Sequence, residues 1–540
     1  MHDKITIKIE KFQGKPDFNW VSDILAQQNS GKIALMILDD EERLIEVPYS
    51  MLLEKAKKYA NFMKDEGLKN GDSIIIMMRM VPDLWYITVA SSIVGIAYSP
   101  APILLSENDI VYRINQTGAK AIFADAYTIK QVMDAAKGIY IKVFNISDDN
   151  FQNKIAMEES FISKFHKDPK EKHAIFFTSG TEGLPKTIVH NGYYPLGHLS
   201  TVQWLGIDSK DIHWNISSPG WAKWAWSNLY APLVAGATAF SFDQERFSAE
   251  RTLSAIENYP VTSLCTAPTV WRMFMVQDLS NFTPAALKKA SSAGEPLNAE
   301  IIKRWKDLTG IMIKDGYGQT ETSAVIGNTD LSKIKPGSAG KPLLHYKVKI
   351  VDDDGKELPV GKEGNIAIDI GNNVPGLFSG YGNDPVLNAE RFKHGYYYTG
   401  DLGKMDSDGY VWFVSRADDV IKASDYRIGP FEVESALLTH PAVVESAVVA
   451  SPDQIRGNVV KAFIILKNGY SPSSSLAREL SFHVKKITAA YMRPKKIEFV
   501  KDLPKTISGK IIRKELRNLE IKRLEDKSTP TAKENEFLVP

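Results

Sequence analysis

Residues 173–190, HAIFFTSGTEGLPKTIVH, pose the first question about this chain. An apolar, strand-like run, Ala174–Phe177, opens into a loop of hydroxyl residues and glycines, and a second strand-like run follows Lys186. Glycines let several backbone N–H groups converge, and converging N–H groups bind phosphate oxygens. The loop differs from the GxxxxGK[ST] phosphate loop, because Pro185 stands where the second glycine belongs. A flexible linker is the alternative interpretation, and the strand-like runs on both sides argue against it.

Short runs rich in β-branched residues alternate with helical patterns on both sides of this loop. The expected strands are Ser73–Met78, Ala121–Ala124, Ile175–Thr178, Ala237–Phe240, Ser263–Cys265 and Ile311–Lys314, with helices such as Tyr49–Gly67 and Ala249–Asn258 between them. This alternation predicts an α/β architecture with largely parallel sheets.

The sequence pattern changes after Gly337. There Asp-Gly turns separate short strand patterns and predict a β-rich portion. After Arg416 the units are shorter and predict a small α+β domain, with strands at Ala447–Ala450, Val459–Leu466 and Lys496–Val500. The last residues are polar with two prolines inside the stretch KRLEDKSTPTAKENEFLVP, so a frayed tail is expected there.

Composition narrows the classes of function. A chain of 540 residues exceeds what one hydrophobic core supports, so at least two domains are expected. Lys and Arg number 66 against 65 Asp and Glu, which gives no electrostatic reason to expect a nucleic-acid partner. The single cysteine, Cys265, excludes an internal disulfide and fits a reducing compartment.

Two segments bear on location. The N-terminal residues alternate charged and apolar types and lack the apolar core of a signal peptide, which favours a cytoplasmic protein. Residues 86–106 carry no charge and are nearly long enough to span a bilayer. Because they contain Gly95, Pro100 and Pro102, we expect a buried helix that runs into a turn, and no membrane span.

Four further stretches strengthen the phosphate interpretation of the loop. They are SSAGEPL (291–297), DGYGQTETS (315–323), YYYTGDLGKMDSDGYVWFVSRADDVIKASDYRIGPFEVES (396–435) and LPKTISGKIIRKEL (503–516). With these the chain resembles, over nearly its whole length, the adenylate-forming (AMP-binding) superfamily, which includes firefly luciferase. A finer likeness, in GWAKWAWSN (220–228), KPGSAGKPL (335–343) and RIGPFEVE (427–434), is to the medium-chain acyl-CoA synthetase branch.

The resemblance implies a fold and a reaction. The fold is a large N-terminal α/β domain over 1–416, built from two α/β sheet layers plus a distorted β-barrel. A small mobile α+β C-terminal domain follows over 417–519, and then a flexible tail over 520–540. ATP and a carboxylic acid would give an acyl-adenylate and pyrophosphate, with Mg²⁺ on the triphosphate, and coenzyme A would then release AMP. A homodimer stays open.

The resemblance also assigns an ATP site. The family's matching loop holds the β- and γ-phosphates, here Thr178, Ser179, Gly180, Thr181, Glu182, Gly183, Leu184, Pro185 and Lys186. The adenine would lie against Gly294, Glu295 and Pro296 and against the segment Asp315, Gly316, Tyr317, Gly318, Gln319 and Thr320, with Tyr317 as the stacking face.

Charged residues complete that implied site. Glu321 would hold Mg²⁺, since a hard cation prefers carboxylate oxygen, and Asp401 would accept both ribose hydroxyls. Arg416 would hold the ribose side, and Arg427 would approach the phosphates or the carboxylate. Lys510 resembles the lysine that bridges the attacking carboxylate and the α-phosphate. With Thr181, Lys186 and Glu321 it completes the implied catalytic set.

The thiol step carries the one departure from the family pattern. Asp425 stands where the family usually has a glycine along the pantetheine tunnel, so a side chain and a negative charge are added there. It could narrow the tunnel, change the thiol acceptor or point elsewhere. The implied coenzyme A contacts are Ser424, Asp425, Tyr426, Arg456 and Arg493, and Asp418 matches the hinge between the domains.

The acid itself is left open by the sequence. Gly318 stands where acetate-specific relatives carry a bulky aromatic residue, so a longer acyl chain is expected to fit. Lys223 and Trp226 are the other acyl-pocket candidates. Short- to medium-chain, branched, hydroxylated and aromatic acids all remain candidates. Two other functions also stay open: an adenylate-forming ligase with a thiol acceptor other than coenzyme A, and a non-catalytic nucleotide-binding protein.

Overall fold

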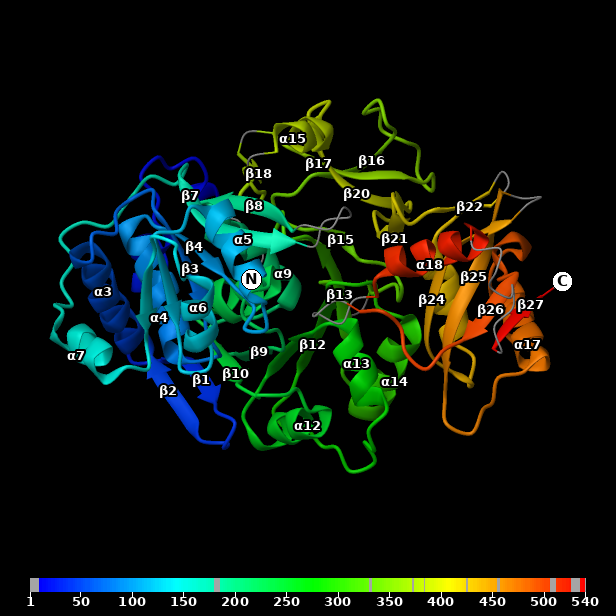
Figure 1. Cartoon of the computed structure of the whole chain (residues 1–540), viewed down its shortest axis with the longest axis horizontal. Coiled ribbons are helices and arrows are strands. Elements are labelled where there is room, and N and C mark those ends of the chain that lie inside the picture. The colour runs from blue at the N-terminus through cyan, green and yellow to red at the C-terminus, as the bar shows by residue number, and fades with distance from the viewer. Residues whose placement is uncertain are drawn as a thin grey trace.

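The computed structural model of the chain has a large N-terminal part with a smaller C-terminal part beside it (Figure 1). It describes residues 9–178, 185–329, 333–371, 373–382, 384–423, 426–453, 457–505, 511–525 and 535–539. The predicted site residues 179–184, 424, 425, 456 and 510 therefore lie outside the described residues.

Two mainly parallel sheets form the body of the N-terminal part, as the alternating pattern predicts. Among the described residues the first has nine strands, in the order β15 (Lys341–Pro342), β14 (Ala324–Gly327), β13 (Ile313–Gly318), β12 (Lys289–Ala293), β11 (Ser263–Thr266), β9 (Ile212–Asn215), β10 (Thr238–Phe242), β1 (Ile33–Leu38) and β2 (Leu44–Pro48). The second has seven, in the order β18 (Gly380–Tyr381), β8 (Lys186–Asn191), β7 (Lys172–Thr178), β4 (Ala97–Pro100), β3 (Ser73–Met77), β5 (Ala121–Ala124) and β6 (Lys142–Asn145).

The third sheet is the β-rich portion expected after Gly337. Its strands pair antiparallel in the order β16 (Val348–Val351), β17 (Gly364–Asp369), β20 (Tyr396–Met405) and β19 (Phe392–Lys393), with β21 (Val411–Arg416) also on β20. Among the described residues the hydrogen-bonded order of these strands is open, so the sheet does not close into a continuous barrel. A bridge between Gly340 and Val411 attaches this sheet to the strand that begins at Lys341.

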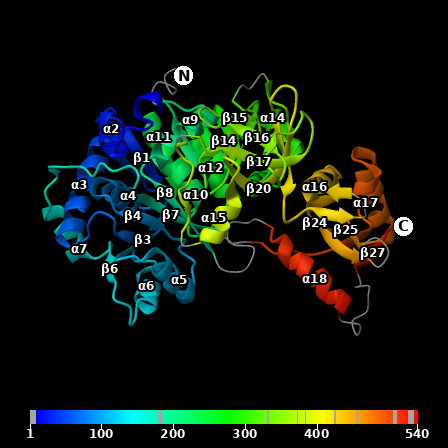
Figure 2. The same ribbon diagram turned by 90° about the horizontal axis from the view of Figure 1, so that it is seen from above.

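The C-terminal part is α+β. A two-stranded ribbon, β22 (Ile421–Ala423) and β23 (Tyr426–Ile428), leads to a sheet of β24 (Val443–Asp453), β25 (Gly457–Leu466), β26 (Lys496–Phe499) and β27 (Glu536–Leu538). Figure 2 shows β24, β25 and β27 to one side of the N-terminal sheets.

The flexible tail expected over 520–540 is wrong for the described residues. Helix α18 (Arg513–Glu525) continues through residue 520, and β27 adds an antiparallel edge to β26. The sequence pattern did not reveal the ion pairs that the buried Lys461 forms with both segments. The ammonium of fully buried Lys461 lies 2.8 Å from Glu520 and 2.7 Å from Glu536, so both segments are drawn onto the sheet.

Helices cover the sheets and fill the connections. They are α2 (Trp20–Asp23), α3 (Tyr49–Asp65), α4 (Pro82–Val94), α5 (Glu107–Thr117), α6 (Ile129–Ala135), α7 (Asp149–Met157), α8 (Tyr194–Gly197), α9 (Leu199–Leu205), α10 (Ala222–Trp224), α11 (Ala231–Ala235), α12 (Ala249–Asn258), α13 (Pro268–Met275), α14 (Ala299–Thr309), α15 (Pro385–Arg391), α16 (Pro430–Leu438), α17 (Ser474–Ile487) and α18. A π-helical segment, Ala225–Tyr230, joins α10 to α11.

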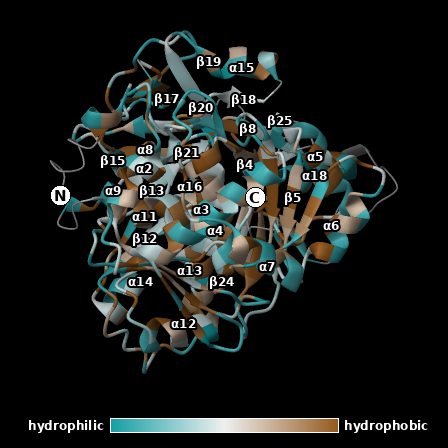
Figure 3. Ribbon diagram, turned by 90° about the vertical axis from the view of Figure 1, so that its left-hand side faces the viewer, coloured by the Kyte–Doolittle hydropathy of each residue, from teal (hydrophilic) through white to brown (hydrophobic). Residues whose placement is uncertain are grey.

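The uncharged stretch 86–106 is buried over 86–94 and 96–102 and reaches the surface at Leu104, and it holds more structure than a helix and a turn. Helix α4 spans Pro82–Val94 and is capped by Gly95, whose φ of 86° is left-handed, and the chain then forms β4 in the seven-stranded sheet. Strand β3 is buried at every position, as a parallel strand covered on both faces should be. Figure 3 shows such interior strands in hydrophobic colours. In the described parts of the chain no helix is long and apolar enough to cross a membrane.

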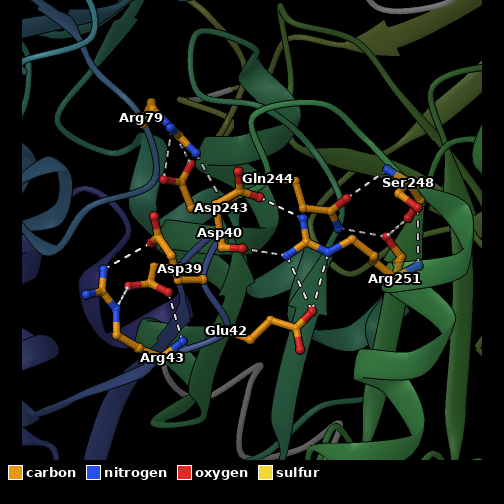
Figure 4. A network of polar contacts seen from close by, with 11 residues as sticks. Asp39, Asp40, Glu42, Arg43, Arg79, Asp243, Gln244, Ser248 and Arg251 are labelled. Carbon is orange, nitrogen blue, oxygen red and sulfur yellow. Dashed lines mark hydrogen bonds and ion pairs between the residues drawn. The ribbon is translucent and has the colours of Figure 1, made fainter.

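A polar network ties the two parallel sheets together (Figure 4). Arg79 follows β3 of one sheet, and its guanidinium lies 3.0 Å from the carboxylate of Asp243, which follows β10 of the other. Burial raises the pKa of Asp243 even with this arginine beside it. The same figure includes the pair Arg43–Asp39, at 2.7 Å, in which the arginine side chain is 74% exposed. The two pairs therefore differ mainly in their access to water.

Replacing Arg79 by Gln should lower the free energy of unfolding by about 1–3 kcal/mol near neutral pH, because Asp243 keeps its charge in a largely buried place. The deficit should shrink as pH falls toward the pKa of Asp243, since protonation removes the unpaired charge. Urea unfolding measures both effects. The matched variant Arg43→Gln should change stability by no more than about 0.5 kcal/mol, and equal losses in the two variants would contradict this account.

Candidate active site

The site is centred on a carboxylate that joins two sheets. Strand β13 of the nine-stranded sheet ends at Tyr317 and Gly318, and strand β20 of the antiparallel sheet carries Asp401. The Tyr317 hydroxyl donates to Asp401 Oδ2 at 2.6 Å. Gln319 Nε2 donates to the same oxygen at 2.7 Å and to the Thr399 carbonyl at 3.0 Å. The structure thus brings together segments 80 residues apart that the sequence assigned to one nucleotide site.

Glu321 follows Gln319 by two residues and contacts a different strand, β18. Its Oε1 accepts a hydrogen bond from the Tyr381 hydroxyl at 3.0 Å. Lys186 Nζ stands over the same tyrosine ring, 5.8 Å from its centroid. The end of the phosphate-loop segment is therefore next to the glutamate that the resemblance assigns to Mg²⁺.

Both ends of the expected phosphate loop are fixed by the seven-stranded sheet. Thr178 at the end of β7 is the register partner of Lys186 at the start of β8. The Pro185 carbonyl accepts a hydrogen bond from the Tyr112 hydroxyl at 2.8 Å. These contacts place the two ends side by side at one edge of the site.

The second adenine stretch follows β12 and meets β13. The Leu297 amide donates to Asp315 Oδ2 at 3.3 Å, so 294–296 lies beside the 315–320 segment. Gly294 has a φ of 111°, a conformation that favours glycine. Glu295 faces Arg272, which also lies 3.9 Å from Glu445 of the C-terminal part.

The buried carboxyl groups make the site electrostatically unbalanced. Burial raises the pKa of Asp315 to about 8. Burial also raises the pKa values of Glu321 and Asp401, and the charge of Asp401 adds to the rise at Glu321. At Asp401, hydrogen bonding to Tyr317 and the charge of Arg416 oppose the effect of burial. A bound cation would relieve this accumulation of negative charge.

The candidate acyl-pocket residues Gly318 and Trp226 lie in contact, and this packing differs from the open space expected at Gly318. A Cβ placed on Gly318 would stand 2.5 Å from Trp226 Cη2, so the indole ring already fills the space that the missing side chain leaves. The expectation of open room above Gly318 is therefore wrong for this structure, because a ring from the π-helical segment packs onto the glycine. Lys223 is turned toward the end of β12, where its ammonium donates to the Ala293 carbonyl at 2.9 Å.

The described part of the small domain supplies few contacts to the site. Arg416, at the end of β21, lies 3.3 Å from Asp418, the residue assigned to the hinge. Arg427 is exposed on β23. The Tyr426 ring stacks on Tyr491, with centroids 4.1 Å apart. The Arg493 guanidinium lies over the Phe482 ring rather than alone at the surface.

Two site residues were missed by the sequence analysis. Tyr397 donates to Gln319 Oε1 at 3.0 Å, and Tyr381 holds Glu321. Residues 397, 399 and 401 alternate along β20, so the strand period could have placed Tyr397 on the same face as Asp401. Tyr381 sits in a two-residue strand, and no pattern in the sequence indicates its role.

Among the described residues, no group of three or more His, Cys, Asp or Glu side chains is arranged to hold a metal ion. Mg²⁺ keeps several waters and is commonly bound by one or two carboxylates together with substrate phosphates. The single carboxylate Glu321, next to the segment that ends at Lys186, provides such a donor.

Fold and site together define the class of adenylate-forming enzymes. The sequence profile described as AMP-binding enzyme matches residues 24–381, and that described as AMP-binding enzyme C-terminal domain matches residues 432–510. The chain belongs to the AMP-binding enzyme family.

Individual relatives support the same placement. The chain is 41% identical to 4-hydroxybutyrate–CoA ligase 1 of Metallosphaera sedula, over 96% of this chain and 94% of that protein. It is 42% identical to the mitochondrial acyl-coenzyme A synthetase ACSM3 of Homo sapiens, over 87% and 82%. A solved anthranilate CoA ligase, AuaEII in complex with anthranoyl-AMP, superposes with a TM-score of 0.85 at 29% identity, over 94% of this chain and 98% of that one.

The raised pKa of Asp315 should make stability depend on pH. The folded chain keeps a proton that the unfolded chain releases between about pH 4 and about pH 8, so stability falls as pH rises through that window. Asp315→Asn should remove a fall of up to about 1.4 kcal/mol per pH unit, as urea unfolding across the window would measure. The control Asp278→Asn should keep the wild-type slope, since the pKa of this exposed carboxyl is lowered. Parallel slopes in all three proteins would refute the assignment.

Proposed function

We propose that this protein, an AMP-forming acyl-CoA synthetase, joins a short carboxylic acid to coenzyme A. In the first step the acid's carboxylate attacks the α-phosphorus of ATP, which gives an acyl-adenylate and releases pyrophosphate. In the second step the coenzyme A thiol attacks the acyl carbon and AMP leaves. The observation that carries the proposal is the meeting of Asp401, Glu321 and Lys186 around Tyr317 and Tyr381.

In this proposal the ribose, the adenine and the phosphates of ATP are each bound by a separate set of residues. Asp401 accepts the ribose hydroxyls, and its bonds from Tyr317 and Gln319 fix the carboxylate before ATP arrives. Arg416 lies on the ribose side. The adenine lies between Gly294–Pro296 and the Asp315–Thr320 segment, with Tyr317 as the stacking face. The loop from Thr178 to Lys186 holds the β- and γ-phosphates, and Lys186 adds a positive charge.

Mg²⁺ is proposed as the cation at Glu321, where it would neutralise charge on the triphosphate. The residues do the positioning: the Tyr381 hydroxyl donates to Glu321 Oε1 and so orients the carboxylate. Arg427 is assigned to the phosphates or the carboxylate. Because the reaction brings anions together, charge neutralisation and positioning are the main work of the site.

Lys510 is proposed to bridge the attacking carboxylate and the α-phosphate. Lys510→Ala should reduce acyl-adenylate formation by at least about 10²-fold, while thioester formation from pre-made acyl-adenylate changes little. Pyrophosphate exchange measures the first step, and acyl-CoA release from synthetic adenylate measures the second. The nearby exposed Lys514 supplies the control variant Lys514→Ala, which should leave both steps intact. Equal losses in the two half-reactions would reject this role.

Coenzyme A is the proposed thiol acceptor, because relatives over nearly the whole chain are named CoA ligases or acyl-coenzyme A synthetases. Ser424, Asp425, Tyr426, Arg456 and Arg493 are its proposed contacts. The effect of Asp425 in place of the family glycine stays a prediction. AMP release that depends on added coenzyme A, and that a carrier-protein thiol does not replace, would support this acceptor. A cytoplasmic location and a homodimer likewise stay predictions.

The proposed acid is short because Trp226 covers Gly318. The name of the Metallosphaera sedula relative, a four-carbon acid ligase, agrees with that length. Exchange of pyrophosphate into ATP with a series of acids from acetate to dodecanoate tests the function. Exchange with none of them would leave a non-catalytic nucleotide-binding protein as the better account.

Trp226→Ala should move the preference toward longer acids. Removing the ring frees the space over Gly318, so the ratio of kcat/KM for octanoate to that for butanoate should rise by about tenfold or more. Trp224→Ala is the matched control, since that indole packs against Trp85 with ring centroids 5.6 Å apart. The control should lose stability without a shift in chain length. An unchanged ratio in the Trp226 variant would mean that another group limits the acid.

A further inference from the structure

Arg113 of helix α5 is a buried cation without a counter-charge. It is 6% exposed, and its Nη1 has no hydrogen-bond partner within the part of the chain that the structure describes. Burial lowers the pKa of Arg113 to about 10, and Asp109 is the only carboxylate among the described residues that opposes this shift. Asp109 Oδ2 is itself used at the start of α5, where it accepts hydrogen bonds from the Ser106 amide at 3.1 Å and the Ser106 hydroxyl at 2.6 Å.

The other Lys and Arg side chains that are buried as deeply among the described residues have partners. Lys461 Nζ lies 2.7–2.8 Å from three glutamate carboxylates. Lys314 Nζ donates to two backbone carbonyls in the last turn of helix α9, at 2.6 and 2.7 Å. Glu171 and Arg391 also have an unpartnered atom, but their side chains are 39% and 24% exposed. The lack of a partner therefore distinguishes Arg113 from the other deeply buried cations.

Arg113 packs against the strand that leads into the implied phosphate loop. Its Cζ lies 4.2 Å from the centroid of the Phe177 ring, which is a cation–π contact. Phe177 directly precedes Thr178, the first residue of that loop. Tyr112, the neighbour of Arg113 in α5, donates to the Pro185 carbonyl at 2.8 Å. Helix α5 therefore contacts the described residues on both sides of the loop.

The unpaired charge of Arg113 selects the chemistry of its partner. A charge held in the interior without a partner costs free energy, and an opposite charge that arrives nearby offsets this cost. The β- and γ-phosphates of ATP would bring several negative charges to the loop that follows Phe177. Two unit charges about 10 Å apart, at an effective dielectric constant of about 20, attract each other enough to change an affinity about tenfold.

We propose that Arg113 is a positioning residue for the triphosphate of ATP, and that it attracts the β- and γ-phosphates from behind Phe177. The inference rests on the proposed function, because it requires the loop that begins at Thr178 to bind phosphate. Arg113 takes no part in the two bond-forming steps. It favours a nucleotide that carries β- and γ-phosphates over AMP.

The variant Arg113→Met tests the charge, because it keeps a long apolar side chain on the Phe177 ring. The KM for ATP in pyrophosphate exchange and the inhibition constant of pyrophosphate should each rise about tenfold. The dissociation constant of AMP, which lacks these two phosphates, should change by less than about threefold. Arg113→Lys keeps the positive charge, so its KM for ATP should stay within about threefold of the wild-type value.

Stability measurements separate this role from a structural one. In Arg113→Met a buried charge without a partner is replaced by an apolar side chain, so the free energy of unfolding in urea without nucleotide should stay equal or rise. The increase in Tm on adding ATP should be smaller than in the wild-type protein at the same ATP concentration. Arg113→Gln takes the place of Arg113→Met if the latter fails to fold.

Arg79→Gln is the matched control. It removes a buried arginine that is paired with Asp243 and that borders the same seven-stranded sheet, so it should lose stability and keep the wild-type KM for ATP.

The outcomes distinguish the inference from the proposed function. Loss of stability in Arg113→Met with an unchanged KM for ATP would overturn the inference and make Arg113 a structural residue. Equal rises in the constants for ATP and AMP would overturn it as well, because the effect would then be independent of the β- and γ-phosphates. In both cases pyrophosphate exchange by the wild-type protein leaves the ligase function standing. No exchange by the wild-type protein with any acid from acetate to dodecanoate would instead overturn the proposed function.

Discussion

The hydrogen bond from Tyr317 to Asp401 is the contact on which the site depends, because it fastens the end of a parallel sheet to an antiparallel one. Gln319 repeats the connection through the same carboxylate oxygen and receives Tyr397 in turn. A carboxylate can only accept hydrogen bonds, so the donors of Tyr317 and Gln319 both point at the Asp401 oxygen. The ribose-binding group we propose is therefore oriented by the same bonds that fix how the two sheets meet.

That arrangement has a cost in stability that a ligand would offset. Burial raises the pKa values of Asp315, Glu321 and Asp401, which means that each charged carboxylate is disfavoured in the folded chain. Residues kept in unfavourable surroundings cluster at functional sites. A cation at Glu321 would add positive charge to that of the neighbouring Lys186, Arg391 and Arg416.

Much of the fold could be predicted from local patterns, while the side-chain packing could not. The runs at Ser73–Met78 and Ala121–Ala124 are β3 and β5, because buried parallel strands are apolar without interruption. The space over Gly318 failed as a prediction, since it depends on where the ring of Trp226, 92 positions earlier, packs in three dimensions. The tail failed for a similar reason: Lys461 recruits Glu520 and Glu536 from segments whose composition alone looks disordered.

The contacts of the small domain differ in length in a way that would suit the rotation about Asp418 that the family resemblance implies. Within that domain Arg513 binds Glu434 at 2.6 Å and Arg517 binds Asp419, so helix α18, which follows Lys510, is firmly attached. Between the domains the corresponding contact is longer, 3.9 Å from Arg272 to Glu445. The short ion pairs would keep α18 with its own domain, and the longer contact would separate first because Coulomb attraction weakens with distance. Since Arg272 also faces Glu295 of the proposed adenine site, the weak contact lies where nucleotide binding can influence it.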